Sequence, residues 1–341
     1  MTQIYELKDK IIRFHAEYEV YLKYAYKFVV ALILFCLING KIGFMTSIAE
    51  LPISLILALV CSLLPKGVMW LVAAALVVLH LNVLSMEVAL VAILMFMLIF
   101  FMYFRFAPKD GMIVAITPIL HVMGIPYLAV IGTGLLRKIY SVAAVLCGTV
   151  AYYFVDGVYQ NVTALQKTDT STGAVEAVKV TVSVEQLLSN KEMYVAVVVF
   201  ALATIAVHVI HKMNIDHAWK VAILSGTLIQ IAGFLAGYLV FDIKGRLVGL
   251  IIGSIISGIL ALGIEFFFMD LDYTRTERLQ FEDDEYLYYV KAVPKRNVTV
   301  TEKSITQFTG FAAMGKKKSK EPAISKKDIV EELGINEEDL N

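Results

Sequence analysis

The stretch "ITPILHVMGIPYLAVIGTGLLRK", Ile116 to Lys138, decides how the fold of this chain is interpreted. It is long enough to cross a bilayer as a helix, for which about 20 apolar residues suffice. Its apolar part nevertheless holds two prolines, three glycines and a histidine. Pro118, Gly124 and Pro126 each disturb helical hydrogen bonding. The segment is therefore either a span that is kinked at proline, or a broken helix that enters the membrane and returns.

The composition around this stretch is that of a membrane protein. Of the 341 residues, 59% are hydrophobic and 18% are charged. Soluble domains average about 25% charged and about 45 to 50% apolar residues. The cysteines, Cys36, Cys61 and Cys147, lie in apolar runs without paired spacing, which argues against a disulfide framework or a zinc knuckle. The sequence predicts an all-α integral membrane protein without a cofactor.

Nine apolar segments are candidates for membrane helices. They divide the membrane domain into a first part, residues 24–155, and a second part, residues 192–269. The second segment is short and bracketed by Pro52 and Pro65, which suggests a tilted helix or half of a helical hairpin. In chain order the segments are Tyr24–Asn39, Leu51–Leu64, Val68–Leu84, Val88–Phe104, Met112–Leu136, Ile139–Val155, Met193–Ile210, Ala218–Phe241 and Leu247–Phe268.

The distribution of basic residues orients these segments. Lysine and arginine gather before the first span, from Lys8 to Lys27, and in the tail, from Lys316 to Lys327. Because positive charge beside membrane spans collects on the cytoplasmic side, we expect both termini there. Two cytoplasmic ends require an even number of crossings, which leaves about eight spans and one segment that re-enters. We assign re-entry to residues 112–136; the alternative is that they cross and the short second segment does not.

Four polar regions flank or interrupt the membrane segments. Residues 1–23 are amphipathic and predict an interfacial cytoplasmic helix. Residues 156–191 form an external polar segment, in which valines alternate with polar residues from Val178 to Val184 and predict a β-strand. Residues 270–303 alternate similarly around an acidic turn and predict a cytoplasmic β-hairpin. Residues 304–341 predict a flexible basic tail with a short helix.

The candidate functional residues are the ionisable and helix-breaking ones at membrane depth, because both kinds are costly in lipid. His121 lies between two breaks and is the first candidate for a substrate pathway. Its alternative role is structural, as a neutral imidazole bonded to a freed backbone carbonyl. No carboxylate or H-x-x-x-H pairing supports a metal site. The predicted pathway residues are Pro118, His121, Gly124, Pro126 and His80.

Small residues recur every four positions along the last span and appear twice in the span before it. Such spacing lets a second helix approach the backbone closely, which is how membrane helices associate. We predict that these two helices pack on each other, or that the last helix packs on its copy in a homodimer. The residues are Gly233, Gly237, Gly245, Gly249, Gly253, Ser257 and Ala261.

The stretch "LDYTRTERLQFEDDEYLYYVKAVPK", Leu271 to Lys295, follows the last span. It resembles the end of a family of uncharacterised bacterial membrane proteins, in which an acidic, tyrosine-rich and proline-closed segment follows the final span. The resemblance covers about 25 residues closely and the hydropathy profile loosely. It implies a bacterial cytoplasmic membrane, and it assigns no functional residues.

Two functions from different classes fit the sequence. The first is a permease-type component of a transport system, since a broken segment and closely packed glycine helices suit a moving pathway. The second is a non-transporting scaffold for envelope or division assembly, with a protein partner on residues 278–303. We do not expect an enzyme, because the sequence lacks a Walker loop, a G-x-S-x-G elbow and an H-E-x-x-H helix. Expected partners are membrane lipids and no nucleic acid.

Overall fold

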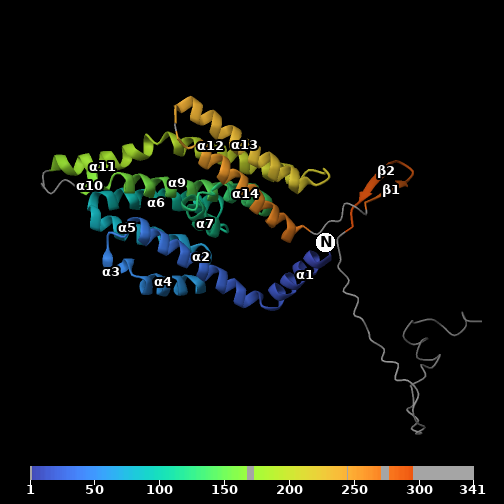
Figure 1. Ribbon diagram of the computed structural model, residues 1–341, viewed down its shortest axis with the longest axis horizontal. Coiled ribbons are helices and arrows are strands. Elements are labelled where there is room, and N and C mark those ends of the chain that lie inside the picture. The colour runs from blue at the N-terminus through green and yellow to red at the C-terminus, as the bar shows by residue number, and fades with distance from the viewer. Residues whose placement is uncertain (1, 167–172, 244, 270–275, 295–341) are drawn as a thin grey trace, which may run out of the picture. The chain divides into compact units, whose positions relative to one another are not determined.

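The structure is a computed structural model that describes residues 2–166, 173–243, 245–269 and 276–294 (Figure 1). The chain divides into two units, residues 1–298 and residues 299–341. The second unit lies outside the described residues, and with it the predicted tail and its short helix. Every described helix and strand belongs to the first unit.

The described chain is mostly helical, which confirms the predicted all-α class. Helices suit its long apolar runs because each backbone polar group is then paired within its own segment. Helices α2 and α4 lie side by side, as do α12 and α13 (Figure 1). In chain order the helices are α1 (Thr2–Glu17), α2 (Glu19–Ile42), α3 (Thr46–Ala49), α4 (Leu51–Leu63), α5 (Val68–Leu84), α6 (Met86–Phe106), α7 (Gly111–Val122), α8 (Tyr127–Leu136), the 3-10 turn η1 (Ile139–Ser141), α9 (Val142–Gln160), α10 (Val162–Gln166), α11 (Gly173–Leu188), α12 (Lys191–His211), α13 (Ala218–Phe241) and α14 (Leu247–Phe268).

Within the described residues, 6 helices are long and apolar enough to cross a membrane. They are α2, α6, the continuous η1–α9 segment, α12, α13 and α14. Helices α4, α5, α7 and α8 are apolar but shorter. The bounds of α13 and α14 match the predicted segments. Helix α2 begins at Glu19, five residues before the predicted start at Tyr24, because the polar residues before Tyr24 continue the same helix.

The broken segment forms a helical hairpin, α7 and α8, with its turn at Met123–Pro126. Gly124 has a φ of +76°, a conformation that glycine adopts without the penalty that other residues carry. The N–H of Ile125 donates to the carbonyl of Leu120 at 2.9 Å and closes the end of α7. Pro126 stands directly before α8, where its missing N–H costs no helical hydrogen bond.

The two arms of this hairpin run in opposite directions. Helix α7 packs beside α9 and runs parallel to it. Three contacts in the same order along both helices show this: Asp110 accepts a hydrogen bond from Ser141, Thr117 faces Gly148, and His121 stacks on Tyr152. The partners in these three pairs are all 31 positions apart in the sequence. Helix α8 packs beside α12 and parallel to it, and α12 runs antiparallel to α9.

The base of the hairpin is closed by a buried carboxylate. Asp110, 3% exposed, accepts a 2.5 Å hydrogen bond from the Ser141 hydroxyl. Its other oxygen lies 3.5 Å from Nε of Arg137, the residue after α8. The start of α7 and the end of α8 are therefore adjacent, and the segment leaves on the side from which it came. Each arm is short, because the 12 residues of α7 extend about 18 Å.

Other contacts distinguish the two ends of the helical unit, which are named the Asp110 end and the Asp156 end after a residue that lies at each. The Asp110 end also holds the start of α2, where Lys27 Nζ donates to the carbonyls of Ser62 and Leu64 at 2.7 and 2.6 Å. Lys8 Nζ donates to the carbonyl of Met269 at 3.0 Å, so α1 lies beside the end of α14. The opposite Asp156 end holds the ion pair of Lys41 with Asp156 and that of Arg246 with Glu192.

The predicted external strand is wrong. Valines 178 to 184 lie within helix α11. The side chains that α11 turns toward its neighbours recur with helical spacing, since Val182, Ser183, Gln186 and Leu187 are wholly or partly buried while Val184 is exposed. Alternation of valine with polar residues failed as a strand signal, because neighbouring Ala, Glu and Leu favour helix and contacts with α6 and α9 stabilise it.

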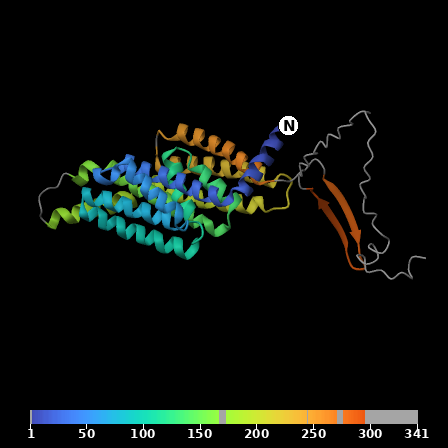
Figure 2. The ribbon, with the colours of Figure 1, turned by 90° about the horizontal axis from the view of Figure 1, so that it is seen from below.

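The prediction of a β-hairpin after the last span is confirmed. Strands β1 (Glu277–Glu282) and β2 (Leu287–Ala292) pair antiparallel, as the opposed arrows in Figure 2 show. In the turn, Asp283 Oδ1 accepts hydrogen bonds from the N–H groups of Glu285 and Tyr286 at 2.9 and 2.7 Å. These bonds lower the pKa of Asp283, because they stabilise its charged form. The cytoplasmic location of the hairpin stays a prediction.

Helices α13 and α14 pack on each other, as one of the two predicted arrangements has it, but several of the predicted small residues face other elements. A Cβ added to Gly233 or Gly237 would lie 2.8 or 2.4 Å from a valine of α12, so these glycines face α12 and not α14. A Cβ on Gly253 would lie 2.5 Å from the carbonyl oxygen of Gly124 in the hairpin turn. Ser257 and Ala261 are fully buried on the same face of α14.

Two of the predicted packing positions do not pack. Among the described residues, apart from the chain neighbours and the helix's own backbone, no atom lies within 4 Å of a Cβ built on Gly245 or Gly249. Gly245 precedes α14 with a φ of +86°, and Gly249 is on an exposed face of the first turns. Because the buried stripe contacts α8 and α13 of the same chain, a homodimer through α14 would have to use its outer isoleucine-rich face.

Candidate functional site

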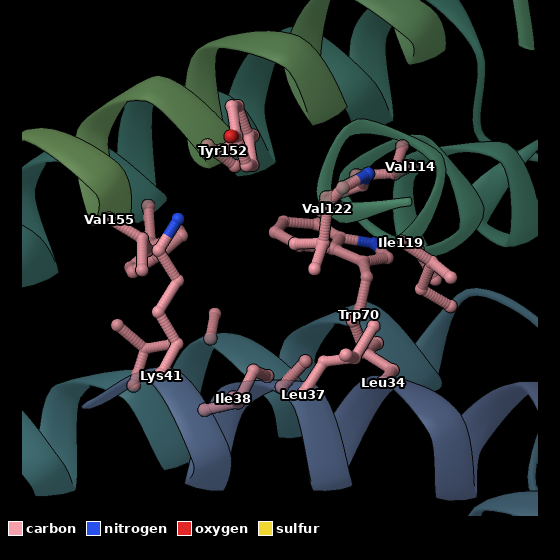
Figure 3. Close-up of a pocket in the computed structure, with 17 residues that line it drawn as sticks. Leu34, Leu37, Ile38, Lys41, Trp70, Val114, Ile119, Val122, Tyr152 and Val155 are labelled. Atoms are coloured by element: carbon pink, nitrogen blue, oxygen red, sulfur yellow. The ribbon is translucent and has the colours of Figure 1, made fainter. Parts of the chain in front are cut away.

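The candidate functional site is a partly open apolar pocket along the broken segment. Four walls come from α2, α5, α7 and α9, and one side chain comes from α6. Figure 3 shows Lys41, Val155 and Tyr152 toward one end and Trp70, Ile119 and Leu34 toward the other. The lining residues are Leu34, Leu37, Ile38, Lys41, Trp70, Ala73, Ala74, Val77, Phe96, Val114, Ala115, Pro118, Ile119, Val122, Ala151, Tyr152 and Val155.

Helix α7 presents one face to this pocket. Val114, Pro118 and Val122 are spaced by four, so they share a side of the helix. The opposite side is packed tightly, since a Cβ on Gly148 of α9 would lie 2.9 Å from the carbonyl oxygen of Val114 and 2.7 Å from Thr117 Cβ. Pro118 cannot donate a hydrogen bond to the Val114 carbonyl. Glycine on α9 thus allows close approach at the level where α7 is interrupted.

The Asp156 end of the pocket is polar. Lys41 is the only charged residue among those that line it. Its ammonium forms an ion pair with Asp156 and lies 4.8 Å from the ring centre of Tyr152 and 5.9 Å from that of Tyr159. The side chains of the pair are 22% and 19% exposed. A partly buried lysine is stabilised by such partners, because the desolvation of an unpaired ammonium is costly.

His121 lies behind this polar end. Its ring stacks on Tyr152 with 4.6 Å between centres and meets Tyr153 and Phe200 edge-on. Nδ1 lies 2.9 Å from the carbonyl of Thr117, to which the neutral tautomer donates. Nε2 is buried and has no partner within the described part of the chain. The imidazole therefore bonds a backbone carbonyl, though not the Val114 carbonyl that Pro118 leaves free.

The structure brings some of the predicted pathway residues together. Pro118 lines the pocket, His121 packs behind Tyr152, and Gly124 and Pro126 form the hairpin turn. His80 lies elsewhere. Its Nε2 is 2.8 Å from Asn39 Oδ1, and its Nδ1 accepts a 3.2 Å hydrogen bond from the N–H of Met45. These contacts hold the connection between α2 and α3, so His80 does not join His121.

Three contributors to the site were missed from the sequence, namely Lys41, Trp70 and Asp156. Lys41 ends the first apolar run and Asp156 follows the sixth, and opposite charges at membrane borders would have been a usable signal. Their pairing is not visible in the sequence, because they are 115 positions apart. Trp70 Nε1 is a buried donor without a partner among the described residues.

Comparison with known proteins assigns no activity to this site. No protein-family model, no curated protein and no solved structure matches the chain. Within residues 2–166, 173–243, 245–269 and 276–294, no group of three or more His, Cys, Asp and Glu residues is placed to hold a metal ion.

Proposed function

We propose that the chain is a multi-pass protein of a bacterial cytoplasmic membrane and a permease-type component of a transport system. In this proposal α2, α4, α5, α6, α9, α12, α13 and α14 cross the membrane. The hairpin α7–α8 enters from the Asp110 end and returns to it. The pocket beside α7 belongs to the substrate pathway.

The charges at the two ends support this topology. Helix boundaries assign Lys66, Arg105, Lys109, Lys138 and Lys212 to the Asp110 end. The described basic residues of the Asp156 end are fewer, and Lys41 and Arg246 among them pair with carboxylates. By the rule that basic loops stay inside, the Asp110 end is cytoplasmic, together with α1 and the chain after α14.

The observation that carries the proposal is the hairpin whose arm α7 lines a pocket. Interrupted backbone at membrane depth is tolerated where it is buried in protein or borders a cavity. Transporters use such discontinuous helices at their binding sites, because free helix ends can then contact the substrate. The arms α7 and α8, with 12 and 10 residues, are about 18 and about 15 Å long, and both are shorter than the hydrocarbon core of about 30 Å.

Cysteine labelling tests the topology. In a variant without Cys36, Cys61 and Cys147, single cysteines replace Lys109 or Lys138, which flank the hairpin. We expect an impermeant maleimide to label both from the cytoplasmic face only, and a cysteine in place of Glu50 from the opposite face only. Labelling of the 109 and 138 positions from opposite faces would mean that the segment crosses, and the hairpin pathway would be abandoned.

Transport is tested through the hairpin turn. Replacement of Gly124 by valine forces a β-branched residue into a φ of +76°, which we expect to abolish transport by native membranes while expression persists. Ile125→Val is the matched control, because it changes the neighbouring turn residue conservatively. Full transport by the Gly124→Val variant would remove the hairpin from the pathway.

A scaffold function is the second candidate, and the β-hairpin favours it. Phe281 and Tyr289 are 54% and 77% exposed, and nearly all residues of both strands are exposed. Two-stranded hairpins are marginal alone, so this one suits a protein partner on residues 278–303. Under this alternative, deletion of Gln280–Lys303 loses a protein that co-purifies from native membranes. Recovery of every complex after the deletion would reject it.

A further inference from the structure

We infer that the pocket binds a single-chain amphiphile with an anionic end group. Its chain lies between α2, α5 and α7, and its end group lies at Lys41. This inference rests on the proposed function, because it names the substrate class of the same pathway. It is tested by binding rather than by topology or transport.

The shape and lining of the pocket fit one apolar chain. The pocket is a partly open hollow between four helices rather than a closed cavity, and 16 of its 17 lining side chains are uncharged. From Leu34 to Lys41 the α2 wall extends over seven residues, or about 10 Å. Along that length the walls are aliphatic or aromatic except at the Lys41 end. An apolar chain gains from burial there, whereas a polar molecule would lose hydrogen bonds to water.

The positive charge of Lys41 at one end of the pocket favours an anionic end group on the ligand. Lys41 is the one charged lining residue, while Asp156, its ion-pair partner, does not line the pocket. An anionic group in the pocket therefore has the Lys41 ammonium, and not the Asp156 carboxylate, as its lining charge. A cationic end group would be repelled at the same place, and a neutral one would gain no charge interaction. A carboxylate and a phosphate share this chemistry.

The polar end is accessible. Val122, which lines the pocket at the end of α7, is 44% exposed, and the Lys41 side chain is 22% exposed. An amphiphile can therefore reach the Lys41 end without displacing the tightly packed contact between α7 and α9. The hairpin turn next to Val122 borders that entrance.

Photo-crosslinking tests the inference on the full-length chain in phosphatidylcholine nanodiscs. The probe is a 16-carbon fatty acid with a diazirine on its chain. We expect cross-linked peptides from α2, α5 or α7, and competition by palmitate or hexadecyl phosphate at concentrations at least tenfold below those of hexadecanol. The stronger of the two anions identifies the end group. Equal competition by hexadecanol would overturn the anionic end group.

Two neighbouring alanines on α5 give a matched pair for the pocket itself. Ala74 lines the pocket and Ala75, the next residue, is exposed on the outer face of α5. Ala74→Phe is expected to fill the pocket and lower cross-linking at least tenfold, whereas Ala75→Phe keeps it. Equal labelling of both variants would place the probe outside the pocket and overturn the inference.

The ion pair gives a readout that separates ligand binding from a structural role. Lys41→Gln is expected to weaken palmitate competition about tenfold and to leave hexadecanol unchanged. Asp156→Asn is expected to keep or strengthen palmitate competition, because it removes a competing carboxylate from Lys41. Equal losses in both variants would mean that the pair only holds α2 to α9. Loss of binding with unchanged cysteine labelling would reject this ligand class and leave the proposed topology standing.

Discussion

Replacement of Gly253 by leucine is expected to lower the free energy of unfolding by about 3 kcal/mol, the upper part of the range for overpacking. A Cβ at this position would lie 2.5 Å from the carbonyl oxygen of Gly124 and 2.9 Å from the Tyr127 ring. The first neighbour is backbone in the hairpin turn, so it cannot rotate away. Either α14 or the turn has to move, and both effects destabilise the contact between α14 and α8.

The matched control is Gly249→Leu, one turn earlier on the same helix. In the part of the chain that the structure describes, no other segment comes within 4 Å of a Cβ there, so its effect should stay within about 0.5 kcal/mol. Thermal unfolding in detergent, followed by recovery of the folded peak on size exclusion, measures both variants. The expected loss corresponds to a melting temperature lower by about 4 to 5 °C, because the entropy of unfolding grows with chain length. Equal stability of the two variants would contradict the contact between α14 and the hairpin turn.

Replacement of Asp110 by alanine is expected to destabilise the base of the hairpin by about 2 kcal/mol, the usual size of a hydrogen bond to a charged group. The substitution leaves the Ser141 hydroxyl and the Arg137 guanidinium without their partner. The Arg137 side chain is 44% exposed and recovers solvation, so the loss comes mainly from Ser141. Hydrogen exchange of the α7 and α8 amides measures it directly.

An opening that costs about 2 kcal/mol less speeds exchange of these amides roughly thirtyfold. Lys109→Ala is the control, because Lys109 is exposed and adjacent to Asp110 in the chain. It should leave the exchange rates of both arms unchanged. Unaltered exchange in the Asp110→Ala variant would show that other contacts hold the two ends of the segment together.

Most of the helix positions could be predicted from the sequence because apolar runs with clear polar borders determine them. The bounds of α5, α13 and α14 match the predicted segments, since each is bracketed by proline, glycine or charge. The break within residues 112–136 was visible for the same local reason, because Pro118 and Gly124 act on their own backbone. These features depend on neighbours in the chain and need no tertiary information.

The errors and omissions arise where distant residues decide. The valines of α11 alternate as they would in a strand, yet contacts with α6 and α9 are made by residues at helical spacing. Spacing predicts that the small residues of α14 pack on α13 or on a second copy; α14 does contact α13, but Gly253 contacts the hairpin turn. Spacing predicts that a face is suited to close packing, and it does not identify the helix that packs there.

The Lys41–Asp156 pair has a consequence for biosynthesis. The two residues are 115 positions apart, which a ribosome at about 5 to 20 residues per second covers in roughly 6 to 23 s. During that interval α2 has been synthesised, but the ammonium of Lys41 near its end cannot yet pair with the Asp156 carboxylate of α9. A ribosome-stalled chain that ends before α9 therefore lacks one wall of the pocket and the counter-ion of its lysine. The pocket can therefore be completed only after α9 has been synthesised.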